Sequence, residues 1–185
     1  HAWMAFRLGD ETAAKLGRLT LNPMAHLDPV GSIALLLMGF GWAKPVPVDV
    51  RFLKNPKEDM MKIAAAGPIS NLFLAVIAAL CLRFLFGNNL LTGSIKSFIV
   101  IFMQINITLA IFNLLPVSPL DGSQILSPFI ERKFGIEMVY KMEMYGPRVL
   151  FFIIIFSMVT GIHLFSFIIN PIFNLFLYIF FTNHL

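Results

Sequence analysis

The sequence predicts an all-α integral membrane protein: a bundle of about 3–5 transmembrane helices with a short re-entrant or β-like membrane-associated segment. Of its 185 residues, 58% are hydrophobic, and the mean hydropathy is +0.81. Charged residues make up only 13%, whereas soluble domains carry about 25%. Several apolar runs approach or exceed the roughly 20 residues that a spanning helix needs. These three observations exclude a soluble domain.

The N-terminal third contains short elements. Residues 1–6 are expected to form the end of a helix, and residues 21–31, LNPMAHLDPVG, a loop that prolines and a glycine interrupt. Residues 33–43 are apolar but too short to span, and two glycines lie among them. They are expected to form a re-entrant hairpin or a pair of membrane-associated strands. Residues 45–53, PVPVDVRFL, alternate as a strand does and predict a short edge element.

The remaining two thirds are dominated by long apolar runs. Spanning helices are predicted at residues 63–86, 95–115 and 149–169. A turn is expected at residues 87–93, and a short amphipathic helix at residues 123–134. The segment from there to Arg148 is expected to be charged and solvated. Asn170-Pro171 is expected to interrupt the third span before a final apolar segment.

The distribution of basic residues predicts the orientation. Residues 44–62 carry five Lys and Arg, and residues 116–148 carry four. By the positive-inside rule both segments are expected to be cytoplasmic. The chain contains no Lys/Arg run and no aromatic-basic interleaving, so no nucleic-acid partner is expected. The lipid bilayer is the expected environment, and the sequence leaves the oligomeric state open.

The stretch from Asn113 to Gly122, NLLPVSPLDG, places an acid at the end of a membrane segment. A charged side chain at bilayer depth costs about 2.5–3.5 kcal/mol, and irregular backbone there must be buried in protein or reached by water. Asp121 is therefore a candidate metal ligand or proton carrier. An equally local alternative is that Asp121 caps a helix starting at Ser123. Asn106 and Asn113 share one helix face and form a polar stripe.

The other candidate residues have ordinary structural explanations. A histidine taken singly is more often a packing residue than a ligand, and this applies to His163 and His184. His26, with Asp28 nearby, is expected to stabilise a turn. Gly67 and Pro68 are expected to kink a helix and allow close packing.

Four segments, HAWMA, LNPMAHLDPVG, AAAGPISN and FNLLPVSPLDG, together resemble the site-2 protease family of intramembrane zinc metalloproteases, in its short prokaryotic form without a PDZ domain. The resemblance runs over most of residues 1–135, in the family's order. It implies a helical bundle that holds Zn²⁺ inside the bilayer near the cytoplasmic side, in the plasma membrane of a prokaryote. It also implies membrane-anchored protein substrates.

The resemblance assigns roles to particular positions. His1 corresponds to the second histidine of the family's H-E-x-x-H motif and Asp121 to the aspartate of L-D-G, and both are metal ligands there. Asn113 corresponds to an asparagine that contacts substrate or the transition state. Residues expected to support the site are Gly67, Pro68, Asn71, Pro116 and Gly122, and His26 is a candidate for its neighbourhood.

The first histidine and the general-base glutamate of the motif are not in the chain, and the family pattern places them directly before residue 1. Residues 1–185 are accordingly expected to form a single membrane-embedded peptidase-like domain that lacks the N-terminal part of the family core. The expected activity is hydrolysis of peptide bonds in membrane-anchored proteins. Two alternatives stay open: a non-catalytic relative or fragment that binds membrane partners, and a small proton-coupled membrane protein that uses Asp121.

Overall fold

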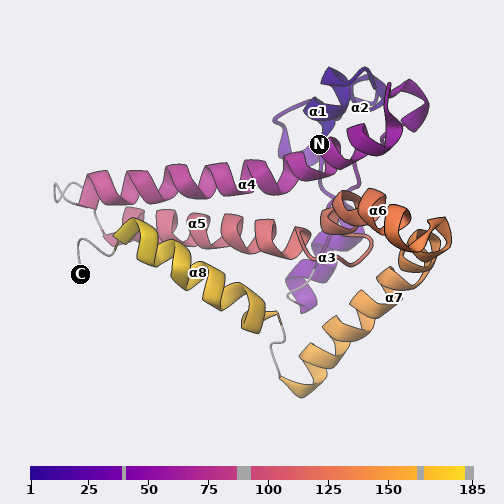
Figure 1. The fold of residues 1–185 in the computed structure, drawn as a ribbon. Coiled ribbons are helices and arrows are strands. Elements are labelled where there is room, and N and C mark those ends of the chain that lie inside the picture. The colour runs from indigo at the N-terminus through magenta and orange to yellow at the C-terminus, as the bar shows by residue number, and fades with distance from the viewer. Residues whose placement is uncertain (39–40, 87–92, 162–164, 182–185) are drawn as a thin grey trace. The chain divides into compact units, whose positions relative to one another are not determined.

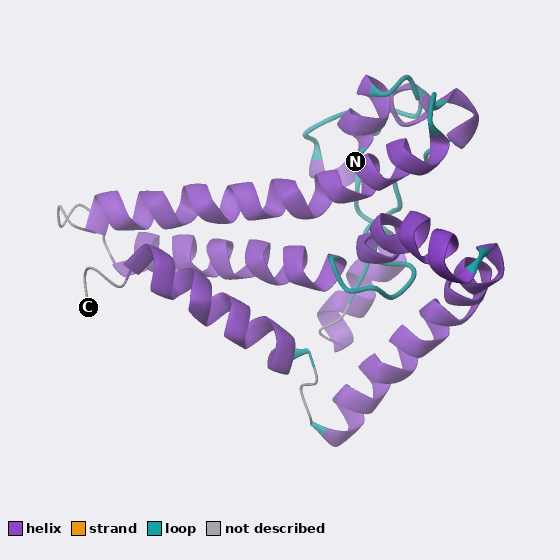
Figure 2. Cartoon of the chain, viewed as in Figure 1, coloured by secondary structure: helices purple, strands orange, loops and turns teal. Residues whose placement is uncertain are grey.

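The computed structural model describes residues 1–38, 41–86, 93–161 and 165–181. Throughout these ranges the regular structure is helical and no strand forms (Figure 2), which confirms the all-α prediction. The chain divides into two compact units, His1–Ile63 and Ala64–Leu185.

The first unit is built from short helices and turns. They are α1 (Ala2–Arg7), α2 (Thr12–Lys15), α3 (Pro29–Met38), the 3₁₀ helices η1 (Pro23–Ala25) and η2 (Val50–Phe52), and the start of α4 (Pro56–Phe86). The expected helix at residues 1–6 is confirmed by α1. A small apolar core consists of Ala5, Leu53 and Ile63, with Met4, Leu8, Val48 and Met60 packed against it.

Polar side chains join distant parts of the first unit. The buried Asp10 carboxylate accepts hydrogen bonds from the backbone N–H groups of Thr12 and Asp49, both at 2.9 Å. Burial by itself raises the pKa of Asp10, but hydrogen bonds from Thr12 and Asp49 hold that pKa below its usual value. The buried Arg18 guanidinium donates to the Lys44 carbonyl at 2.6 Å. These bonds link residues that are 39 and 26 positions apart.

The re-entrant hairpin or strand pair predicted at residues 33–43 falls partly on residues 39–40, which lie outside the described residues. Residues 33–38 are helical and belong to α3, so the strand-pair alternative is wrong there. The chain then returns beside the start of α3: Leu27 and Ala43 form an isolated bridge, and the Lys44 N–H donates to the His26 carbonyl at 2.9 Å. Gly31 lies so close to the Trp42 carbonyl that an added Cβ would overlap it.

The predicted edge strand at residues 45–53 is also wrong. Pro45 and Pro47 cannot donate to a sheet ladder. The Asp49 side chain accepts the Arg51 N–H at 3.0 Å and starts η2. Hydrogen bonds from the Arg51 side chain and backbone lower the pKa of Asp49 to about 2.

The second unit contains the long helices. After the remainder of α4 come α5 (Gly93–Asn113), α6 (Asp121–Phe134), α7 (Ile136–Thr160) and α8 (Ser166–Phe181). Its core lies where α4, α5 and α8 meet (Figure 1), and it is formed by Ala75, Ala78, Ala79, Leu82, Met103, Ile107 and Ile111. The alanines leave room for the larger side chains of α5, and α8 contributes phenylalanines including Phe173 and Phe176.

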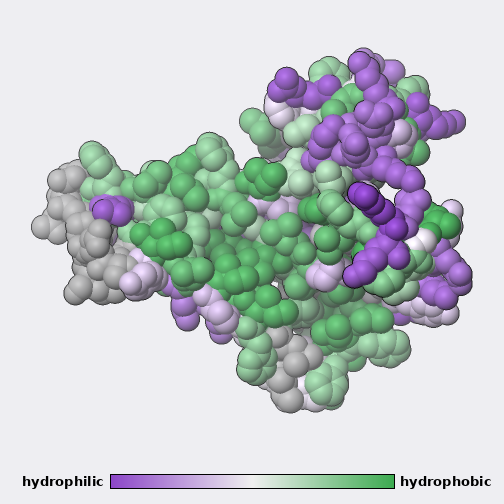
Figure 3. All heavy atoms as spheres, viewed as in Figure 1, coloured by the Kyte–Doolittle hydropathy of each residue, from purple (hydrophilic) through white to green (hydrophobic). Residues whose placement is uncertain are grey.

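Among the described residues, three helices are long and apolar enough to cross a membrane: Pro56–Leu85, Gly93–Asn113 and Ile136–Thr160. Only 33%, 28% and 11% of their most apolar windows are buried inside the protein. On the face that Figure 3 shows, apolar side chains cover much of the long helices, and many polar side chains gather in the region of α1 and α2. Helices that are apolar on all sides require a lipid or protein environment. The chain is a membrane protein.

Several predicted helix limits are corrected. α4 begins at Pro56, and α7 begins at Ile136, so the segment expected to be a solvated loop before Arg148 is helical. The last break falls at Gly161, whose φ of +70° ends α7 in a left-handed cap, whereas α8 runs through Pro171. The predicted turn at 87–93 lies almost entirely outside the described residues, as do His163 and His184.

Candidate functional site

The turn between α5 and α6 shapes the NLLPVSPLDG stretch. α5 ends at Asn113, and the next residues leave the helix through a series of tight turns. The Leu115 N–H donates to the Phe112 carbonyl at 3.1 Å, and the Leu120 N–H donates to the Val117 carbonyl at 2.9 Å. The turn therefore satisfies part of its own backbone, as irregular backbone beside a membrane helix must.

Asp121 is the first residue of α6, and Leu120 occupies the N-cap position. The Ser123 hydroxyl donates to the Leu120 carbonyl at 2.7 Å. The local alternative that Asp121 itself is the N-cap is therefore wrong. A carboxylate in the first turn is still favoured by the helix dipole. The side chain is half-buried.

Gly122 explains why glycine follows the aspartate. It is buried against the end of α5, and an added Cβ would overlap the carbonyl groups of Leu114 and Leu115. The start of α6 can approach the end of α5 only without a side chain here. This contact brings Asp121 and Asn113 to the same turn, with the exposed Pro116 between them in sequence.

The two asparagines of the polar stripe bond back to their own helix. The Asn106 side-chain amide donates to the Phe102 carbonyl at 2.8 Å, and that of Asn113 donates to the Leu109 carbonyl at 2.9 Å. Asn106 is buried, whereas Asn113 is partly exposed. Asn113 is therefore the member of the stripe whose amide solvent or another molecule can reach.

His1 lies in the first unit, immediately before α1. Its Nδ1 is 2.7 Å from the Ile63 carbonyl oxygen of α4. Because a carbonyl only accepts, Nδ1 carries a proton in this contact. Metal-binding histidines commonly have this arrangement, with the second nitrogen donating to a backbone carbonyl. The orientation of His1 thus fits a ligand that binds through Nε2.

His26 stabilises its loop. Its Nε2 is 2.8 Å from the Thr20 carbonyl oxygen, and the ring is only partly buried. Asp28 acts separately, because its carboxylate accepts the Gly31 N–H at 2.8 Å near the start of α3. Each residue therefore bonds to a different part of the loop, and the structure shows no direct bond between His26 and Asp28.

The GPISN residues lie in the interior of α4. Pro68 is fully buried, and Gly67 and Asn71 are half-buried, one turn apart. The Ser70 hydroxyl donates to the Gly67 carbonyl at 2.7 Å. Prolines are tolerated inside membrane helices when neighbouring groups satisfy the backbone. α4 continues past Pro68 to Phe86, so this motif packs without ending the helix.

The structure thus gathers Asn113, Pro116, Asp121 and Gly122 at the α5–α6 turn, and it fixes the ring of His1 on α4. Within the described ranges, no group of three or more His, Cys, Asp or Glu side chains could hold a metal ion. An imidazole and a carboxylate are both donors that Zn²⁺ prefers. The chain therefore offers donors of the right chemistry without a complete set.

Comparison with known proteins places these features in a class of membrane metalloproteases. Peptidase family M50 matches residues 87–157. The chain is 41% identical over 179 residues, 94% of its length, to "Putative zinc metalloprotease YwhC" of Bacillus subtilis, and it covers 78% of that protein. It is 29% identical over 136 residues to "Putative zinc metalloprotease Rip2" of Mycobacterium tuberculosis, of which it covers 51%. No solved structure matches the chain.

The chain belongs to peptidase family M50, the site-2 protease family. The resemblance inferred from the sequence motifs is thereby confirmed, and so is the class of enzyme, a zinc metalloprotease. The chain also spans about half the length of Rip2. The family match includes the whole α5–α6 turn and most of α7.

Proposed function

We propose that this chain is the membrane-embedded part of a zinc endopeptidase that hydrolyses peptide bonds of membrane-anchored proteins. Family membership and three helices of spanning length support this proposal. The observation that carries it is the α5–α6 turn, where a glycine that admits no side chain holds Asp121 against the end of a membrane helix. A carboxylate built into such a position is costly, and metal binding explains its presence.

His1 and Asp121 are the proposed ligands of Zn²⁺ in this chain. The Ile63 carbonyl would orient the imidazole through its contact with Nδ1, and Nε2 is the nitrogen proposed to bind the metal. In the family pattern, the other histidine ligand and the general-base glutamate directly precede the position of His1. Zn²⁺ bound there supplies Lewis-acid chemistry, which activates water and polarises a peptide carbonyl.

Asn113 is proposed to contact the substrate. Its amide lies at the end of α5, partly exposed and in the same turn as Asp121. A side-chain amide there could donate to the substrate backbone or to the oxyanion that develops during hydrolysis. One such donor contributes roughly 3–4 kcal/mol to transition-state stabilisation. Gly67, Pro68, Asn71, Pro116 and Gly122 are proposed to support the site through the packing described above, and His26 through its loop.

The proposed location is the plasma membrane of a prokaryote, with the site toward the cytoplasm. The excess of Lys and Arg in residues 44–62 and 116–148 supports this orientation. It places the segment that carries Asp121 on the cytoplasmic side. Residues 1–185 are proposed to act as one peptidase domain, to which both compact units contribute.

The proposal is tested on the full-length encoded protein in detergent or nanodiscs. Zinc content and cleavage of a single-span reporter substrate are measured for the wild type, Asp121→Asn, and the control Glu131→Gln, which alters the other acid of α6. We expect stoichiometric zinc and cleavage in the wild type and control, and loss of both in Asp121→Asn. A wild-type protein that purifies without zinc, or an Asp121→Asn variant that retains zinc and cleavage, would overturn the assignment.

A further inference from the structure

Gly146 of α7 makes a close contact with the turn that leads to Asp121. A Cβ added at Gly146 would lie 2.7 Å from Ser118 Cβ, 2.8 Å from the Ser118 carbonyl oxygen and 2.9 Å from the Ser118 backbone nitrogen. Real Cβ atoms essentially never approach other heavy atoms this closely. Two of the three atoms belong to the backbone, so a change of rotamer cannot relieve the overlap.

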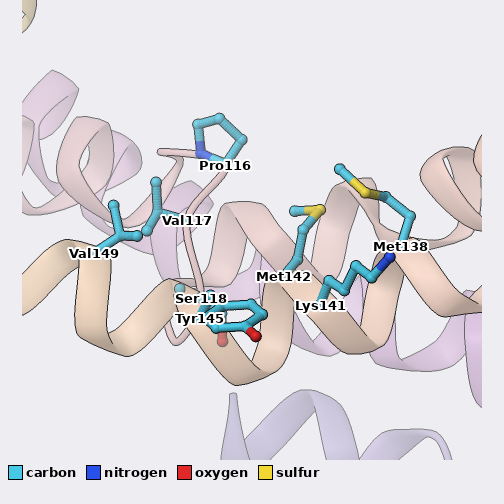
Figure 4. A pocket seen from close by; sticks show the side chains of 9 residues that line it. Pro116, Val117, Ser118, Met138, Lys141, Met142, Tyr145 and Val149 are labelled. Carbon is cyan, nitrogen blue, oxygen red and sulfur yellow. The ribbon is translucent and has the colours of Figure 1, made fainter.

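The contact is local. Beside it, the turn residues Pro116 and Val117 and the α7 side chains of Met138, Met142 and Val149 line a largely apolar cavity of about 310 Å³ (Figure 4). Along this flank the turn is therefore not tightly packed on α7. The backbone approach at Gly146 is the place where α7 limits the position of Ser118.

Ser118 lies three residues before Asp121, and hydrogen bonds join the neighbouring residues of this short stretch. The Leu120 N–H bonds back to Val117, and Ser123 bonds to Leu120 through its N–H at 3.1 Å and through its hydroxyl at 2.7 Å. On the other side of Asp121, Gly122 is fixed against Leu114. The aspartate thus lies between two glycine contacts, that of Gly122 with Leu114 just after α5 and that of Gly146 on α7 with Ser118. Because only two residues separate Ser118 from Asp121, a shift of Ser118 is expected to move the carboxylate as well.

We propose that Gly146 is a positioning residue for the metal ligand Asp121. This inference rests on the proposed function, because it takes Asp121 as a ligand. Because position 146 has no side chain, α7 can contact the backbone of Ser118 directly. This contact sets the position of the turn and, through it, the position of the Asp121 carboxylate. A residue that positions a ligand without touching the metal typically changes metal affinity by about 10- to 100-fold when it is altered.

The test measures Zn²⁺ affinity in the full-length protein by competition with a chelator, a readout that does not depend on activity. Gly146→Ala is expected to weaken binding about tenfold, and Gly146→Val to weaken it further. The matched control is Gly161→Ala on the same helix. Gly161 has a positive φ and no atom within 4 Å of an added Cβ, so this substitution strains α7 without touching the turn. It should lower the melting temperature and leave Zn²⁺ affinity unchanged.

Two further measurements separate displacement of the turn from general unfolding. Adding Ser118→Gly to Gly146→Ala removes the atom at 2.7 Å and leaves the two backbone contacts, so affinity should recover in part. Amide exchange at Leu120 should accelerate in Gly146→Ala, because its bond to Val117 is disturbed. Wild-type affinity in both Gly146 variants would overturn the inference. So would equal losses in Gly146→Ala and Gly161→Ala. If Asp121 were not a Zn²⁺ ligand, Asp121→Ala would retain Zn²⁺. That result distinguishes a failure of the proposed function from a failure of this inference.

Discussion

In the first unit, His1–Ile63, the buried Asp10 carboxylate accepts a hydrogen bond from a residue 39 positions away, and the buried Arg18 guanidinium donates to a residue 26 positions away. In the second unit, Ala64–Leu185, the buried polar side chains of Asn106 and Ser123 bond only three or four residues away on their own helices. Short helices and turns leave backbone groups that side chains must satisfy. Long helices satisfy their own backbone, so their packing depends on apolar shape. The two units should therefore respond to different kinds of substitution.

The largest expected effect is in the first unit. Asp10→Ala removes the acceptor of two backbone N–H groups, those of Thr12 and Asp49. Each buried donor left without a partner costs about 1–3 kcal/mol, so the loss of unfolding free energy should be about 3 kcal/mol. Chemical denaturation in detergent micelles measures it. The control is Glu11→Ala, whose exposed pair with Lys15 is worth below about 1 kcal/mol. Equal losses in the two variants would contradict the role given to Asp10.

A smaller effect is expected in the core of the second unit. Ile107 is 1% exposed among α4, α5 and α8, whereas Ile105 on the same helix is 52% exposed. Because lipid is as apolar as the core, Ile107→Ala loses packing contacts more than transfer energy. We expect a loss of about 2 kcal/mol, the lower end of the range for such truncations. Ile105→Ala should cost much less. If Ile105→Ala proved the more destabilising, the assignment of inner and outer faces would be wrong.

The sequence predicts the second unit better than the first, for the same physical reason. An apolar run of sufficient length forms a helix wherever it lies in the chain, so α4 and α5 were predicted. The return of residues 41–44 onto the start of α3 depends on contacts such as that between Gly31 and Trp42. Such long-range contacts leave little trace in local periodicity.

The errors in the helix limits could have been avoided with local signals. Pro56 occupies the first turn of α4, and Glu58 and Asp59 follow it; together they form a typical helix start. Glu137 and Lys141, four residues apart, form an ion pair at 2.9 Å inside α7, a spacing that favours helix over loop. Charge in these segments predicts orientation and contact with solvent, and it is also compatible with a helix.

For the candidate site, the sequence predicts residues, and the structure adds the geometry around them. The motif LDG indicated Asp121, and only the structure shows that Gly122 has no room for a side chain against Leu114. Gly146 was not predicted, because it lies 28 positions from Ser118, the residue it contacts. A glycine within an otherwise helical charged segment is a signal of close packing, and it could have pointed to this residue.

The smallest expected effect concerns acid conditions in the first unit. The pKa of Asp49 is lowered from 3.8 to about 2, chiefly by hydrogen bonds from the Arg51 side chain and backbone. A carboxylate whose pKa is lower in the folded than in the unfolded state stabilises the fold at pH values above the unfolded-state pKa. This contribution is lost as the pH falls from 3.8 toward about 2. In Asp49→Asn, the free energy of unfolding should depend less on pH over this range than in the wild type. Because Arg51 is exposed, 1 M salt should reduce the difference between the two proteins.

The same substitution leaves the backbone N–H of residue 49 to donate to Asp10. It also removes the negative charge that raises the pKa of Asp10, so the Asp10 pKa should fall further in Asp49→Asn. The amide protection of residue 49, followed from pH 5 to pH 2 by hydrogen exchange, reports on this bond. Protection that persists to lower pH in Asp49→Asn than in wild type would show that the two carboxylates are coupled. Protection lost at the same pH in both would mean that the charge of Asp49 does not influence the titration of Asp10.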